Sequence, residues 1–402
     1  MKSYLLLIMA IFGLMRPAHG QDSTKPSGIE IYGFAQLDAG YDFKQINPAW
    51  SDALRVTKLP TYANQYAPDG NVFFGVRQTR FGVKGYTPTP IGELKAVFEF
   101  DMFGVGADEG QTTMRLRHAY GEVGRILAGQ TNSTFMDASI FPNIMEYWGP
   151  CGMVFFRNLQ IRYAAMTGDN ELYISLEKPG VSADQGTLET RIEIDSVKAH
   201  YPLPDLSAHF KKSGDWGHVQ LAGILRNIQW SDIHTTGVYN LTGSTLGWGL
   251  HLSSVLNVTK DNVIRLAIIY GQGVENYMND CPVDVGIIRN PGDITKPVTG
   301  KALPVLGYVA YFEHNWTPKL STTIGYSGIH IDNTEFSSPS AYKDGQYATL
   351  NLIATPFKNA LVAAELEYGK RTDFTDGFSA NTVKLQFSFK YSFSQNFYFN
   401  KN

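Results

Sequence analysis

Residues 93–102 read ELKAVFEFDM, and every second side chain in this stretch is apolar. A period of two with bulky apolar groups on one side is typical of a strand that has one face buried. The same alternation returns in residues 113–121, 158–163 and 383–393. The pattern therefore predicts β-structure along the chain. In the first stretch the apolar side consists of Leu94, Ala96, Phe98, Phe100 and Met102, and the other side carries Glu93, Lys95, Glu99 and Asp101.

Sixteen such strands can be placed, and the joins between them alternate between short and long. A soluble sandwich or propeller gives no reason for that alternation, whereas a membrane barrel needs an even number of strands, short turns at one end and long loops at the other. We therefore predict an all-β fold, a 16-stranded antiparallel transmembrane β-barrel with short periplasmic turns and long extracellular loops. The predicted strands cover residues 29–41, 72–86, 93–102, 112–122, 125–131, 153–164, 171–178, 205–213, 218–230, 246–257, 263–271, 305–316, 320–331, 345–355, 360–371 and 378–393.

Composition agrees with this fold and excludes several others. The mean hydropathy is -0.17, and no run of about 18 apolar residues is long enough for a membrane-spanning helix. The 39 Gly, 22 Tyr and 24 Phe suit a barrel with aromatic girdles at both membrane interfaces. The net charge of -3, without a basic tail, gives no indication of a nucleic-acid partner.

The first twenty residues are typical of a cleaved signal peptide. Lys2 supplies the positive charge, residues 4–14 form an apolar run too short to span a bilayer, and residues 18–20, Ala-His-Gly, match a cleavage site. An N-terminal core helix is the alternative. We expect removal of residues 1–20 on export to the Gram-negative outer membrane. Residues 21–402 would then form the barrel domain, with a short segment 21–28, the barrel 29–393 and a tail 394–402.

A barrel of this size cannot be filled by its own side chains. An unpaired backbone amide in hydrocarbon costs several kcal/mol, so the sheet must close on itself. Sixteen strands leave a water-filled lumen faced by the polar side chains, while the apolar side chains face outer-membrane lipid. The loop 132–152 has more apolar side chains than a solvated loop needs, among them Phe135, Met136 and Trp148. We expect this constriction loop to fold into the barrel and narrow it.

Cations cluster on the polar side of neighbouring predicted strands. A ring of Arg or Lys in a pore selects anions, and Arg can bind a carboxylate through two hydrogen bonds. The alternative is that these groups are simply solvated and paired with Glu93, Glu99 and Asp101. Arg77 and Arg157 fall on the apolar side, where we expect an interface or a protomer contact. The candidate residues for binding small anionic solutes are Arg80, Lys84, Lys95, Arg115, Arg117 and Arg162.

Acids and polar groups occupy the polar side of strands on the opposite wall. Glu365 and Glu367 lie there, with Thr349 and Asn351 on the preceding strand. Acids that face cations across a pore produce a transverse field that orients dipolar solutes. We interpret these residues as a second, acidic side of the channel.

Only two cysteines occur, Cys151 and Cys281, in the third and sixth long loops. They are too few for a disulfide scaffold, but an exported protein permits one bond. Such a bond would pin the constriction loop to a surface loop. Two unpaired thiols are the alternative.

No catalytic, metal-binding or cofactor-binding motif is present. The nine His are scattered, without a His-x-x-Glu-His motif, a close Cys/His group or a Gly-x-Ser-x-Gly elbow. We therefore expect a channel for small hydrophilic solutes, with no cofactor and no metal. A general non-selective pore, an adhesive or structural barrel, and a hydrolytic barrel with Ser and His from separate strands are the alternatives.

Several segments resemble outer-membrane porins. Residues 31–38, IYGFAQLD, are similar to the opening of many of these proteins. Four further segments together resemble the DcaP-like porins, and the resemblance covers most of the chain after Gln21. These segments are residues 74–85 (FGVRQTRFGVKG), 116–121 (LRHAYG), 128–135 (AGQTNSTF) and 146–163, with a weaker likeness in 214–220.

The resemblance implies a homotrimeric, sixteen-stranded porin with an inward loop and a basic constriction that favours small dicarboxylates. Some members carry a coiled coil before the barrel, whereas here only residues 22–28 separate Gln21 from the first predicted strand. The terminal aromatic strand, residues 384–393, is followed by residues 394–402. The barrel assembly machinery is an expected partner, and it recognises an aromatic C-terminal strand. Because residues 394–402 follow that strand here, the exact residues that this partner contacts stay open.

Overall fold

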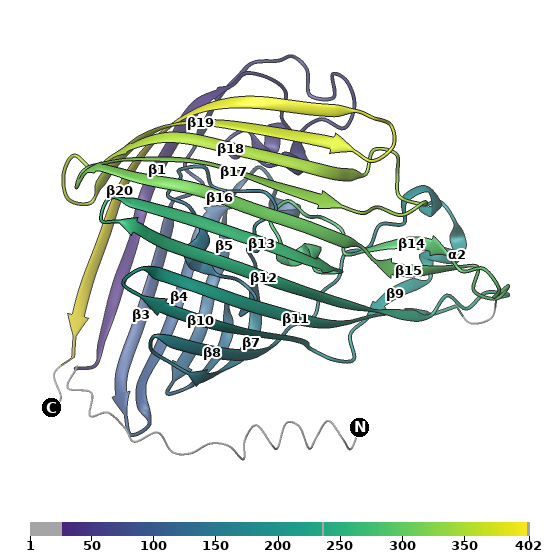
Figure 1. Cartoon of the computed structure of the whole chain (residues 1–402), viewed down its shortest axis with the longest axis horizontal. Helices are drawn as coiled ribbons and strands as arrows, with labels where there is room; N and C mark the ends of the chain where they lie inside the picture. Colours follow the sequence, from purple (N-terminus) through teal and green to yellow (C-terminus); the bar gives the residue numbers. More distant parts are fainter. Residues whose placement is uncertain (1–25, 235–236, 400–402) are drawn as a thin grey trace.

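The computed structural model describes residues 26–234 and 237–399 of the chain (Figure 1). The predicted signal peptide, residues 1–20, and the tail residues 400–402 lie outside this part. Within the described ranges, no helix has both the length and the apolar character that a membrane crossing requires.

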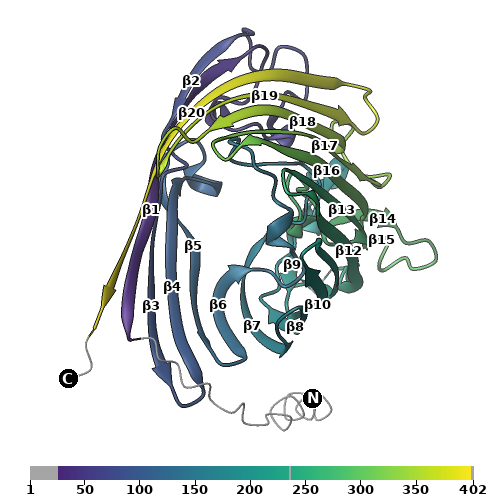
Figure 2. The ribbon, with the colours of Figure 1, turned by 60° about the vertical axis from the view of Figure 1, so that its left-hand side comes forward.

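Sixteen antiparallel strands form one closed ring (Figures 1 and 2). β1 closes the ring by pairing with β20, from Gly28↔Tyr398 to Asp42↔Lys384. β2 and β3 both pair with β1 and are two halves of one interrupted strand. The predicted barrel is therefore confirmed. Its strands are β1 (Gly28–Asp42), β2 (Asn71–Gly75), β3 (Arg80–Thr89), β4 (Gly92–Phe103), β5 (Thr112–Val123), β6 (Ile126–Asn132), β7 (Arg157–Met166), β8 (Asn170–Glu177), β10 (Asp205–Gly214), β11 (Gly217–Asp232), β12 (Gly243–Thr259), β13 (Asn262–Gln272), β16 (Pro304–Thr317), β17 (Leu320–Ile331), β18 (Tyr342–Ala354), β19 (Ala360–Asp373) and β20 (Ser379–Tyr398).

Three short strands lie in the long loops instead of the ring. β9 (Val197–His200) pairs with the end of β11, and β14 (Val285–Arg289) forms a hairpin with β15 (Val298–Ala302). All long loops lie at one end of the barrel, as expected when short and long joins alternate. We name four of them: the first loop (43–70), the constriction loop (predicted as 132–152 and observed as 133–156), the fourth loop (178–204) and the sixth loop (273–303).

The strands alternate as the sequence predicts, but their buried side is the polar one. On β19 the odd-numbered side chains from Ala363 to Asp373 are buried inside the barrel, whereas Leu366 is exposed on the outside. A bilayer solvates apolar side chains, so the outer surface of a membrane barrel can be apolar. The inner side chains are buried because loops cover them.

The largest apolar core lies inside the barrel and is built mainly by these loops. Leu54 of the first loop, Phe135 of the constriction loop and Tyr277 of the sixth loop belong to one buried cluster. Figure 2 shows segments inside the ring between β6 and the opposite wall. The loops therefore fill part of the lumen and divide the polar wall into covered and open regions.

The second predicted strand, residues 72–86, is broken at residues 76–79. The backbone turns there, because the N–H of Thr79 donates to the carbonyl of Val76 at 3.0 Å. The guanidinium of Arg77 forms a buried ion pair with the carboxylate of Asp52 in the first loop. The interface position predicted for Arg77 is wrong, because it assumed the parity of an unbroken strand.

β7 begins at Arg157, four residues after the predicted start at residue 153. The preceding residues pair with the sixth loop instead. Phe155 donates its N–H to the carbonyl of Tyr277 at 3.0 Å, and Asn279 donates to the carbonyl of Met153 at 2.8 Å. The constriction loop is therefore fixed to the sixth loop before the chain rejoins the wall.

β20 continues to Tyr398, past the predicted end at residue 393. Its last residues pair with the start of β1, where Ile29 lies opposite Phe397 and Gly33 opposite Phe393. The predicted tail therefore belongs to the barrel strand as far as Tyr398.

Candidate functional site

The constriction loop follows the inner wall of the barrel, and polar wall side chains hold its first half. The N–H of Thr134 donates to Glu177 on β8 at 3.0 Å, and the ring of His209 on β10 lies 2.8 Å from the carbonyl of Thr134. On β11, His218 lies 2.7 Å from the carboxylate of Asp137. Three neighbouring strands thus fix the start of the loop.

The second half of the loop is held by carboxylates of the opposite wall. Glu313 on β16 accepts the N–H of Asn143 at 2.8 Å. Glu365 on β19 accepts the N–H groups of Met145 and Glu146, at 2.9 and 2.8 Å. Buried backbone donors need such partners, so these carboxylates determine where the loop lies in the barrel.

The acidic side of the channel expected from the sequence is covered by loops. Glu365 and Glu367 are each 1% exposed, and Thr349 and Asn351 are each 3% exposed. The side chain of Asn351 donates to the carbonyl of Asn143 at 2.9 Å and so also supports the constriction loop. The interpretation of these residues as a solute-facing wall is wrong, because the loop lies between them and the open lumen.

The apolar residues singled out in the constriction loop lie in two places. Phe135 and Met136 are buried in the apolar core against the barrel wall. Trp148 reaches the open lumen, and the guanidinium carbon of Arg55 lies 3.9 Å from its ring centroid. The first two residues therefore anchor the loop, whereas Trp148 faces the solute path.

A cavity of about 600 Å³ lies between the constriction loop and the wall formed by β1, β3, β5, β6, β7 and β20. The wall supplies most of its charge, and the loop supplies mostly apolar and aromatic groups. The charged wall residues are Arg80, Arg115, Arg117, Arg157 and Lys390, and the loop residues include Phe141, Ile144, Met145, Glu146, Tyr147 and Trp148.

Two carboxylates behind the cations orient three of the guanidinium groups. Arg117 bridges Glu99 at 2.9 Å and Asp101 at 2.7 Å. Arg115 binds Asp101 at 2.9 Å, and Arg80 lies 3.7 Å from Glu99. The expected pairing with Glu99 and Asp101 is thus present, but two acids are shared among three cations. The cluster keeps a positive charge toward the cavity.

The other three predicted cations do not line this cavity, although they lie on the same part of the wall. They sit nearer the periplasmic ends of their strands, below the level of the constriction loop. Lys84 pairs with Glu30 at 3.1 Å, Lys95 lies 3.9 Å from Glu122, and Arg162 lies over a tyrosine ring at 5.0 Å.

Arg157 and Lys390 line the cavity, although the sequence reasoning did not select them. Neither has a carboxylate within 4 Å among the residues that the structure describes. Arg157 lies over Phe155 and Lys390 over Phe34, each at 5.2 Å from the ring centroid. The interface position predicted for Arg157 is wrong, because β7 starts at this residue. The polar parity of residues 384–392 could have found Lys390.

Glu146 is the only acid among the described residues that line the cavity. Its carboxylate accepts the N–H of Leu54 in the first loop at 2.8 Å and also the N–H of Gly149. Burial raises the pKa of Glu146 to about 7, although Lys384 and the backbone N–H groups act in the opposite direction. The charge of this side chain therefore changes near neutral pH.

The two cysteines are both free and buried. They belong to the apolar core that joins the constriction loop to the sixth loop. The disulfide expected from the sequence is not formed in this structure. Burial raises the pKa of both thiols, so neither is in its reactive thiolate form at neutral pH.

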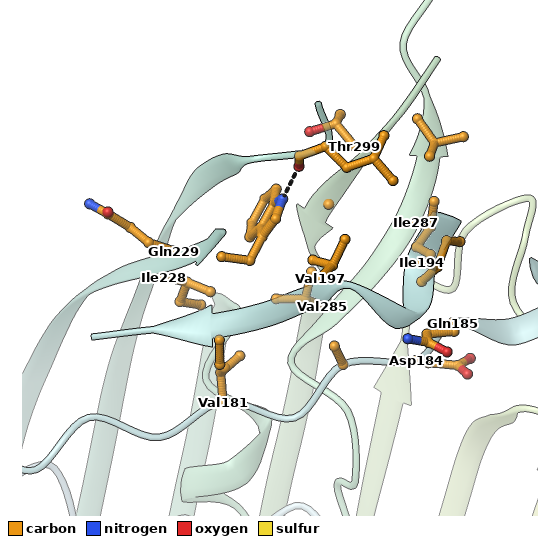
Figure 3. Close-up of a pocket in the computed structure, with 16 residues that line it drawn as sticks. Val181, Asp184, Gln185, Ile194, Val197, Ile228, Gln229, Val285, Ile287 and Thr299 are labelled. Carbon is orange, nitrogen blue, oxygen red and sulfur yellow. Dashed lines mark hydrogen bonds between the residues drawn. The ribbon is translucent and has the colours of Figure 1, made fainter. Parts of the chain in front are cut away.

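An apolar pocket of about 130 Å³ lies among the long loops and the end of β11, and it shares no lining residue with the cavity at the constriction (Figure 3). Val181, Ile194 and Val285 line it from the fourth and sixth loops, and Ile228 lines it from the end of β11. No basic side chain is present among its lining residues. It therefore does not extend the cationic surface of the constriction.

A closed sixteen-stranded ring around a polar lumen, narrowed by an inward loop, defines a porin, a channel of the outer membrane. A family model described as DcaP outer membrane protein matches residues 18–393. The chain belongs to this family, and the resemblance seen in the sequence is confirmed. A search of the curated proteins gives no match.

Solved structures show the same fold. The outer membrane channel DcaP of Acinetobacter baumannii is 22% identical with a TM-score of 0.74, over 94% of this chain and 100% of that chain. An anion-selective porin from Comamonas acidovorans is 10% identical with a TM-score of 0.59, over 91% and 100%. OmpT of Vibrio cholerae, in its trimer form, is 10% identical with a TM-score of 0.54, over 92% and 100%.

Proposed function

We propose that this porin is anion-selective and lets small dicarboxylates diffuse across the outer membrane. The observation that carries the proposal is the imbalance of charge at the cavity, where the charged part of the lining consists of five basic side chains and one carboxylate. Two of the bases, Arg157 and Lys390, have no carboxylate within 4 Å among the described residues. A basic constriction lowers the barrier for anions and raises it for cations.

The arrangement of the cations supports a solute with two carboxylates. Arg80, Arg115 and Arg117 lie on β3 and β5, whereas Arg157 and Lys390 lie on β7 and β20. Guanidinium groups bind carboxylates with directed, charge-assisted hydrogen bonds. A dicarboxylate can therefore place one carboxylate on each of these two sets of cations, whereas a monocarboxylate of the same size can occupy only one set at a time.

We also propose a homotrimer, by analogy with the trimer form of the Vibrio cholerae OmpT that shares the fold. Residues 1–20 are removed on export in this proposal, and the barrel assembly machinery inserts the remaining chain. Chemical cross-linking of the purified protein in mild detergent tests the assembly. A monomer under these conditions contradicts the trimer without affecting the selectivity proposal.

Planar-bilayer recording tests the selectivity. In a potassium chloride gradient we expect the reversal potential to have the sign of the chloride equilibrium potential. We also expect a dicarboxylate to block the chloride current at a lower concentration than a monocarboxylate does. Cation selectivity, or a current that both acids reduce equally, would falsify the proposal.

A further inference from the structure

A groove of about 650 Å³ runs over the lipid-facing side of the barrel on β13 and β16 to β20. One row of cross-strand neighbours alternates small and large side chains: Ala310, Tyr326, Ala348 and Tyr368 are successive partners on β16 to β19. The two alanines leave space between the tyrosines. The volume lies in the range of about 300–1,000 Å³ that is typical of ligand sites.

The next row toward the extracellular end is polar. Gln346, Lys370 and Asn381 are cross-strand partners there on β18, β19 and β20. Lys370 lies on the outward side of β19, because the side chains at odd-numbered positions of this segment are the buried ones. Lys44, just after β1, joins the row by donating from Nζ to Oδ1 of Asn381 at 2.9 Å.

The charge of these two lysines is not neutralised on the protein. No carboxylate lies within 4 Å of Lys370 or Lys44 among the described residues. The neighbouring Asp344, one row further out, is held by His330, with 2.5 Å between Nδ1 and Oδ1. The polar row therefore offers two ammonium groups to a partner outside the chain.

The spacing of the two rows matches an amphipathic ligand. Side chains two residues apart on one strand face lie about 7 Å apart, so Lys370 lies directly beyond Tyr368 at the mouth of the groove. Aromatic rings are typical of the membrane interface, and basic side chains beside it attract anionic lipid head groups. A protomer contact on this face would bury two lysines without a carboxylate, at high desolvation cost.

We propose that this face binds a phosphorylated glycolipid of the outer leaflet, with an acyl chain in the groove and a phosphate group between Lys370 and Lys44. The site is separate from the pore, and the proposal does not depend on which solute passes through the channel. In this proposal a lipid molecule is bound specifically to the outer face of β16 to β20.

Native mass spectrometry of the purified protein tests the site. The probe is a bisphosphorylated glucosamine-disaccharide lipid, compared with its dephosphorylated form. We expect the wild type to bind the phosphorylated form, and the double variant Lys44→Gln with Lys370→Gln to bind it about tenfold more weakly. Ala348→Phe fills the groove without changing charge, and it should weaken both forms.

The matched control is Lys260→Gln with Lys319→Gln, which removes the same charge from two periplasmic turns. Each variant is first checked for the heat-modifiable gel mobility of a folded barrel. The proposal is overturned if the lysine variant binds like the control, or if removal of the phosphates from the lipid leaves its affinity unchanged. Cross-links between protomers through a cysteine placed at Ala348 would also overturn it.

Discussion

Arg117 and Tyr147 both line the cavity and contact each other, with 3.3 Å between Nη1 and the hydroxyl oxygen. Both donate to the same oxygen of Asp101, Arg117 at 2.7 Å and Tyr147 at 2.5 Å. Arg117 belongs to the wall strand β5, and Tyr147 to the constriction loop. One carboxylate therefore joins the cationic wall to the loop and holds the two sides of the cavity together.

Replacement of Tyr147 by Phe should loosen the constriction. The variant loses the hydrogen bond to the Asp101 carboxylate, worth about 1.5–3 kcal/mol, while the wall anchors of the loop remain. We expect greater noise in the open-channel current and an unchanged temperature of barrel unfolding. Tyr62→Phe, at an exposed tyrosine of the first loop, is the control and should show wild-type noise. Equal noise in both variants would show that the bond does not restrain the loop.

Arg157→Gln should reduce anion selectivity more than Arg162→Gln does. Arg157 lines the cavity without a carboxylate partner within 4 Å, whereas Arg162, on the same strand, lies outside it. The two substitutions change charge equally, so only position distinguishes them. Reversal potentials in a salt gradient should give a several-fold lower ratio of anion to cation permeability for Arg157→Gln alone. Equal shifts would place the selectivity outside this cavity.

Selectivity should depend on pH through Glu146. Burial raises the pKa of this carboxyl to about 7, so below that pH it is neutral and above it carries a negative charge. The net positive charge of the cavity is therefore larger in acid, and the preference for anions should fall as pH rises from 5.5 to 8.5, about 1.5 units on either side of this value. Glu146→Gln should remain at the acid value throughout. If the anion preference of this variant falls with pH by the same amount as that of the wild type, another group is responsible for the pH dependence.

The buried thiols should resist alkylation in the folded barrel. Cys151 and Cys281 are 0% and 4% exposed, and burial raises the pKa of both. A maleimide should label neither residue in detergent and both after denaturation without reductant. Electrophoretic mobility should be the same with and without reductant. Labelling that requires reductant would instead demonstrate the disulfide expected from the sequence.

The barrel could be predicted from the sequence because its signals are local. The alternation in residues 93–102 depends only on neighbouring side chains, and it correctly separates Phe98 from Glu99. Parity also identified Arg80, Arg115 and Arg117 as lumen residues that line the cavity. These inferences need no knowledge of which distant segments pair.

The remaining features depend on contacts between segments far apart in the chain. Lys84 and Lys95 have the expected parity, but the height of the constriction loop, fixed by wall residues such as Glu365, excludes them from the cavity. Arg157 was misplaced because residues 152–155 pair with the sixth loop, more than a hundred positions away. Glu365 likewise anchors the constriction loop instead of facing solute, and its position in the sequence does not show that this distant loop covers it.

The pairing of β1 with β20 ties the first barrel residues to the last ones. Gly28 lies opposite Tyr398, so residues from nearly opposite ends of the described chain must meet before the ring is complete. Contacts of this kind are slow to form, because the entropy of closing so large a loop is lost before the contact is made. Until the final strand arrives, both margins of the sheet have unpaired amides that hydrocarbon cannot tolerate. Closure of this ring therefore requires β20, and a chain that ends at β19 leaves β1 and β19 each without the partner that β20 provides.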